Sequence, residues 1–124
     1  MTVNETENIV LRMLGYINNL GYTNDSDLRS SIIPQINSIY ADLWYRCKKR
    51  KDDEVFKAVS AVDDEIALPP ELLDDCFLYG VAMSVAAAEG DGEQQQYYAA
   101  LYNQKRGLCS HFDEVVDIFP SPWL

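Results

Sequence analysis

Residues 65–102 read EIALPPELLDDCFLYGVAMSVAAAEGDGEQQQYYAALY, and this stretch decides the fold. Pro69-Pro70 ends a short apolar run, and the second proline suits the first turn of a helix. Small and apolar side chains then continue to about Glu89, with acids near the start, where the helix dipole favours negative charge. The break at Gly90-Asp91-Gly92 separates this helix from a tyrosine-rich helix expected over about 93–108. The stretch therefore predicts a helical hairpin.

The N-terminal part of the chain predicts two further helices. Apolar side chains at helical spacing indicate a first helix over about 5–20. A second amphipathic stripe ends in a basic run at 46–51, where cations complement the helix dipole. Pro34 either begins this second helix or kinks a longer helix that begins at Asp25. We favour the longer helix, because the stripe extends back to Leu28 and aspartate is a good N-cap.

Between the second and third helices the pattern changes to that of strands. Two short runs, 55–59 and 65–68, flank an acidic turn and predict a β-hairpin. The expected fold is mainly α, with about four helices in a small bundle, a short hairpin at about 55–68 and an extended C-terminal tail. The division is a helical domain over 1–111 and an extended segment over 112–124, where two prolines oppose a helix.

Composition and charge limit the class of protein. The chain has 124 residues, 48% of them hydrophobic, which is typical of one globular domain. The net charge is −10, but residues 1–51 carry +2 and residues 52–124 carry −12. This balance argues against a protein that grips phosphates over most of its surface. The longest uncharged run, 76–88, is too short for a membrane span, so no membrane partner is expected. We expect the protein to be made in a cytosol.

Candidate chemistry is sparse. The one histidine, His111, lies two residues after Cys109, and a metal site needs three or four ligands. Three cysteines without a C-x-x-C pair indicate neither a disulfide framework nor a zinc knuckle. We therefore expect no catalytic residue, no cofactor and no metal site. An enzyme using Cys109, His111 and nearby acids stays as an alternative, which loss of activity in His111→Ala would reveal.

Two segments have the character of contact surfaces. A basic patch at the end of the second helix can touch phosphate, meet an acidic protein or stay solvated, and it consists of Arg46, Lys48, Lys49, Arg50 and Lys51. The C-terminal segment carries large apolar side chains, which disordered tails usually lack. Its aromatic anchor, Trp123, either docks on a partner or folds back on its own domain. The apolar members are Val115, Val116, Ile118, Phe119, Trp123 and Leu124.

The order of these signals resembles the head-to-tail connector (adaptor) proteins of tailed bacteriophages. In that family a helix opens with Leu-Pro and an acid a few residues on, as Leu68-Pro69 and Asp74-Asp75 do here. An aromatic-small pair, an acidic turn and a tyrosine in the next helix follow, which Tyr79-Gly80, Gly90-Asp91 and Tyr102 match. The resemblance is clearest over 25–103, and each motif is short. Pro34 within the second helix departs from the family pattern.

The resemblance implies a structural virion protein rather than an enzyme. Its members form a ring of identical subunits, usually twelve-fold, beneath the portal protein. The ring extends the DNA channel and docks a tail or stopper protein, while DNA passes without sequence-specific binding. The implied location is the head–tail junction of a virion, or its prophage counterpart, made in the bacterial host cytoplasm. The hairpin and tail would reach neighbours or the portal through Val55, Phe56, Ile66 and Leu68 and through the apolar side chains of 115–124.

One other class remains open besides the enzyme. A small acidic helical regulator would bind a protein partner or mimic DNA, with acids clustered on one face. It would be a monomer or dimer and would form no ring.

Overall fold

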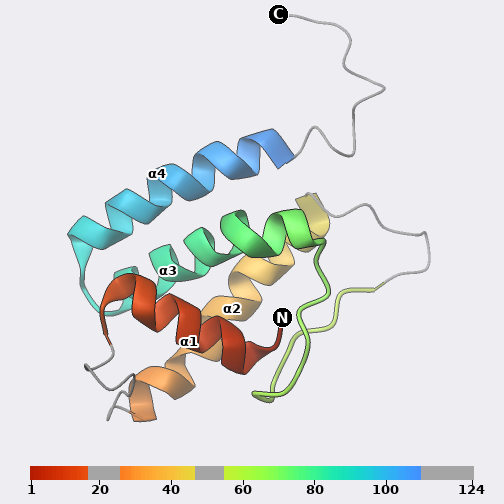
Figure 1. Ribbon diagram of the computed structural model, residues 1–124, viewed down its shortest axis with the longest axis horizontal. Coiled ribbons are helices and arrows are strands. Elements are labelled where there is room, and N and C mark those ends of the chain that lie inside the picture. The colour runs from red at the N-terminus through yellow and green to blue at the C-terminus, as the bar shows by residue number, and fades with distance from the viewer. Residues whose placement is uncertain (17–25, 47–54, 110–124) are drawn as a thin grey trace, which may run out of the picture.

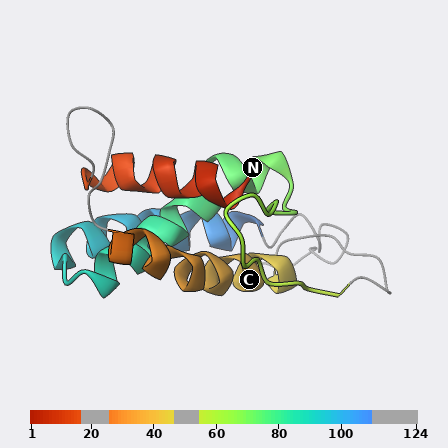
Figure 2. The same cartoon turned by 90° about the horizontal axis from the view of Figure 1, so that it is seen from below.

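The computed structural model describes residues 1–16, 26–46 and 55–109, and it is mainly α with four helices packed together. Figure 1 shows the four helices, and Figure 2 shows α1 and α2 on opposite sides of α3. The elements are α1 (Val3–Leu14), α2 (Ser26–Arg46), the π-helical turn η1 (Leu72–Cys76), α3 (Phe77–Ala88) and α4 (Gly92–Cys109). The mainly helical fold class is thus confirmed, while the tail of 112–124 lies outside the described residues.

Helix α3 is the centre of the bundle because it contacts each of the other three helices. It contains no charged residue, and side chains from several of its faces are buried, as expected for a helix that is apolar all round. Its most completely buried large side chain is Phe77. The uncharged run that is too short for a membrane span therefore forms the core of a globular bundle.

Glycines define the ends of two helices. Gly15 follows α1 with φ +74°, and its N–H reaches the carbonyls of Leu11 and Arg12, so the helix stops there. The expected end near residue 20 was wrong, because the apolar stripe continues past the residue that adopts the left-handed conformation. Gly90, with φ +75°, makes the turn between α3 and α4 as expected.

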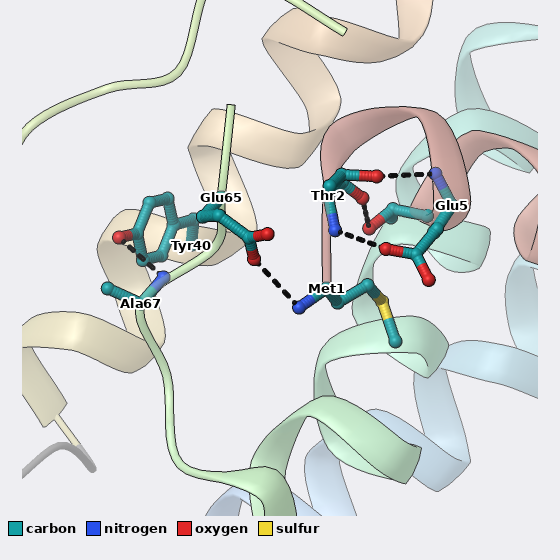
Figure 3. Close-up of polar contacts among 7 residues, drawn as sticks. Met1, Thr2, Glu5, Tyr40, Glu65 and Ala67 are labelled. Carbon is teal, nitrogen blue, oxygen red and sulfur yellow. Dashed lines mark hydrogen bonds and ion pairs between the residues drawn. The ribbon is translucent and has the colours of Figure 1, made fainter. Parts of the chain in front are cut away.

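The second helix continues through Pro34, which confirms the longer of the two alternatives. Its apolar stripe is buried against the core from Leu28 to Trp44. The proposed cap at Asp25 lies outside the described residues. Helix α1 begins with a capping box that sequence inspection missed: Thr2 Oγ1 accepts from Glu5 N, and Glu5 Oε1 accepts from Thr2 N at 2.9 Å (Figure 3).

The β-hairpin expected at about 55–68 is not formed. These residues are described and contain no strand, apart from one isolated antiparallel bridge between Glu65 and Thr2. The segment pairs with the N-terminus instead: Val3 N donates to Asp64 O and Ile66 N donates to Met1 O. The Met1 amine also lies 3.1 Å from a Glu65 carboxylate oxygen (Figure 3). Two isolated strands are marginally stable, so pairing with a helix start replaces pairing with each other.

Side chains of α2 bond further backbone groups of this segment. The Asn37 amide donates to Val59 O at 2.9 Å and accepts from Val59 N at 2.8 Å. The hydroxyl of Tyr40 accepts a hydrogen bond from Ala67 N at 3.0 Å (Figure 3). The segment is therefore held as an extended loop against α2, without a sheet of its own.

Polar contacts also connect α1 to its neighbours. At its C-terminal end, Leu14 O accepts from the Gln94 amide at 3.0 Å and Met13 O accepts from the Tyr98 hydroxyl at 3.2 Å, so α4 caps α1. Along its length, the buried Glu7 carboxylate lies 3.5 Å from the Arg29 guanidinium of α2. Burial raises the pKa of Glu7, and the arginine opposes that shift.

Candidate functional site

The structure separates the predicted contact residues of segment 55–68 into two groups. Val55 has 72% of its surface exposed, whereas Ile66 and Leu68 are buried in the core. The two buried side chains offer no surface to a partner in this conformation. Phe56 is partly buried against the same core. Val55 is therefore the exposed candidate of the four, and its role in a subunit interface stays a prediction.

Phe56 is held by an aromatic cluster on α2. Its ring centroid lies 5.0 Å from that of Tyr40 and 6.0 Å from those of Trp44 and Tyr45. The pairs with Tyr40 and Trp44 are edge-to-face, an arrangement that adds to the energy of simple burial. Tyr45 nevertheless has 60% of its surface exposed. The cluster thus fixes the 55–68 segment while leaving one aromatic ring on the surface at the end of α2.

An open groove of about 970 Å³ lies between the C-terminal halves of α2 and α4. Its charged and polar lining comes from both helices: Asp42, Tyr45 and Arg46 on α2, and Tyr102, Asn103 and Arg106 on α4. Two of these side chains are cations and one is an anion. The lining therefore has one net positive charge, although the whole chain, with twenty acidic and ten basic residues, is acidic.

Asp42 joins the two walls of the groove. The Arg106 guanidinium contacts it through two nitrogens, with Nη2 2.8 Å from Oδ1 and Nε 2.5 Å from Oδ2. The Tyr102 hydroxyl donates to the same Oδ2. These charge-assisted bonds hold the pKa of Asp42 below its usual value, with Arg106 the largest cause. Burial and the adjacent carboxylate raise the pKa of the Tyr102 hydroxyl far above its ordinary value, so the tyrosine stays a proton donor.

A second ion pair and a buried thiol adjoin this site. Lys105 Nζ lies 3.2 Å from Asp75 Oδ2, which connects α4 to η1. Cys76 is buried beside them, and burial raises the pKa of its thiol to about 12. A thiol with that pKa is a core side chain and not an activated nucleophile at neutral pH.

Most of the remaining predicted site residues lie outside the described part of the chain. Arg46 is described: it is exposed at the last position of α2 and lines the groove. Lys48, Lys49, Arg50 and Lys51 are not described, and neither are His111, Val115, Val116, Ile118, Phe119, Trp123 and Leu124. Their proposed roles stay predictions.

Sequence inspection missed the groove and its central carboxylate. The available signal was the one-turn spacing of Tyr102 and Arg106, which places both on one face of α4. Nothing in the sequence shows that Asp42, sixty residues earlier, would lie opposite them.

Asp42 gives a pH-dependent contribution to stability. Because its folded-state pKa is lowered, the contribution is present above the pKa of the unfolded carboxyl and is lost as pH falls through the folded value. We expect Asp42→Asn to unfold more readily than wild type at pH 7, with the difference shrinking below about pH 4. Denaturant unfolding of both proteins from pH 7 to pH 2 tests this. An unchanged difference across that range would contradict it.

Within residues 1–16, 26–46 and 55–109, no three His, Cys, Asp or Glu side chains are placed to hold a metal ion. Among the helices in these ranges, none is long and apolar enough to cross a membrane.

Comparisons of the chain with models of protein families, with curated proteins and with solved structures found no match.

Proposed function

We propose that this chain is a structural head-to-tail connector of a tailed bacteriophage. In this proposal identical copies form a ring, twelve-fold where it matches the portal, which extends the DNA channel and docks a tail or stopper protein. It acts at the head–tail junction of the virion and is not an enzyme. The acidic second half would suit a channel wall along which DNA slides, and a basic lumen in an assembled ring would contradict that part of the proposal.

The observation that carries the proposal is where the residues of the resemblance lie. Leu68-Pro69 directly precedes the helical stretch that leads through η1 into α3, and Gly90-Asp91 makes the turn from α3 to α4. Gly80 lies against the Tyr102 ring where α3 and α4 cross. The matching residues therefore occupy the joints of the fold, where a shared architecture would require them. This supports a common fold, from which the function is inferred.

The arrangement of segment 55–68 gives the proposal a specific test. Val55 and Val62 belong to the same segment and are exposed at 72% and 52%, so they form a matched pair. Only Val55 adjoins the aromatic cluster at the end of α2, through Phe56. An aspartate at either exposed position leaves the core intact, whereas a charge within an interface opposes association.

We expect Val55→Asp to reduce ring formation or portal binding about tenfold or more, and Val62→Asp to behave as wild type. The measurement is native mass spectrometry with negative-stain imaging of the full chain. It is made alone and with the portal protein encoded in the same genome, because isolated connectors can stay monomeric. Thermal unfolding of both variants controls for folding.

A wild-type chain that stays monomeric and does not bind the portal would contradict the connector proposal. The fold would stand, and the acidic regulator or DNA mimic would become the better explanation. If the two valine substitutions had equal effects, the observed assembly would still stand, but Val55 would no longer be assigned to the interface.

A further inference from the structure

The groove between α2 and α4 combines features of a peptide-binding surface. Its polar lining includes the exposed Arg46 and the partly buried Arg106, which is paired with Asp42. The ring of Tyr45 adds an exposed aromatic surface at the same end of α2. A cationic and aromatic groove on a protein with net charge −10 favours an occupant that is acidic and apolar.

Residues 112–124 of this chain, FDEVVDIFPSPWL, have that chemistry. They carry three acids and no base, and the acids alternate with pairs of apolar residues. The segment also begins close to the groove: α4 ends at Cys109, three residues beyond Arg106, which is about 5 Å along a helix. Fifteen residues after α4 span up to about 50 Å when extended, so reach is not limiting.

We propose that, in the isolated chain, residues 112–124 dock into the groove between α2 and α4 of the same molecule. The acids of the segment face Arg46 and Arg106, and its apolar side chains cover the exposed Tyr45 ring. A tethered segment has an effective concentration in the millimolar range, which favours its own groove over that of another molecule in dilute solution. The proposal concerns the monomer and holds whether or not the chain is a phage connector.

Two matched pairs of variants test the groove. Arg46→Glu reverses a charge in the groove, and Arg12→Glu makes the same change at an exposed position in the last turn of α1. Tyr45→Ser removes the aromatic surface, and Tyr97→Ser removes a ring of similar exposure (62% against 60%) on α4. All four positions are exposed, so each variant should fold, and circular dichroism checks that it does.

The readout is amide hydrogen exchange of residues 112–124 in the full-length monomer, compared with a synthetic peptide of residues 110–124. We expect exchange about tenfold slower than in the peptide for wild type, Arg12→Glu and Tyr97→Ser. In Arg46→Glu and Tyr45→Ser the segment should exchange nearly as fast as the peptide. Reversing the three acids of the segment to lysine in the Arg46→Glu background should restore part of the protection.

Each other result overturns the proposal. Exchange at the peptide rate in wild type means that the segment is undocked. Protection that survives both groove substitutions places the segment elsewhere. Protection that appears only as protein concentration rises makes a second copy the occupant.

Discussion

Substituting alanine for Gly80 is expected to destabilise the fold by about 2 kcal/mol. A Cβ at this position would lie 2.7 Å from Ile39 Cγ2 and 2.7 Å from the Tyr102 ring, closer than van der Waals contact permits. Ile39 belongs to α2 and Tyr102 to α4, so α3 is confined on two sides and cannot move away from one neighbour without meeting the other. Alanine's better helix propensity, worth about 1 kcal/mol, offsets only part of an overpacking cost of up to about 3 kcal/mol.

The measurement is thermal and urea unfolding of wild type and Gly80→Ala, with a fall in melting temperature of about 5–10 °C expected. Gly107→Ala is the matched control, because a Cβ there meets no atom within 4 Å and the residue is exposed within α4. That control should be as stable as wild type or more stable, through helix propensity alone. A Gly80→Ala protein with wild-type stability would show that the three helices do not cross as described.

The same crossing explains why the helical part of the fold could be predicted. Helix α3 is uncharged and largely apolar, so its sequence predicts that it is buried. The glycine within it indicates that another helix approaches closely. The sequence did not predict which residues of the neighbouring helices would contact that glycine. Tyr102 lies one turn before Arg106, yet the sequence gives no sign that both meet Asp42 across the groove. Patterns within one element are visible in a sequence, whereas pairings between distant elements depend on the packing.

The failed hairpin shows a second limit. Residues 55–59 and 65–68 have the composition of strands, and composition predicts that backbone groups will find partners. It does not predict which partners. Here the start of α1 and the side chains of α2 supply them, at positions whose residue types are common on any helix surface. Likewise the apolar stripe predicted that α1 would extend to about residue 20, whereas Gly15 adopts the left-handed conformation and ends the helix there.

The second large effect is expected at Asn37, whose amide makes both backbone bonds of Val59. Val59 is buried and Asn37 is partly buried, so water replaces these bonds only in part when the side chain is removed. An unsatisfied buried donor or acceptor costs about 1–3 kcal/mol, and Asn37→Ala leaves one of each. We therefore expect a loss of about 2–4 kcal/mol in the free energy of unfolding.

Because Asn37 holds one extended segment rather than the helical core, its loss should also have a local signature. Backbone amides of residues 55–66 should exchange with solvent faster in Asn37→Ala, while those of α3 keep their relative order of protection. Ser38→Ala, at the neighbouring exposed position of α2, is the control and should change neither property. Equal exchange of 55–66 in the two variants would mean that the Met1, Thr2 and Tyr40 contacts alone hold the segment. In that case the contact between the N-terminus and this segment, and not the amide of α2, would replace the missing hairpin.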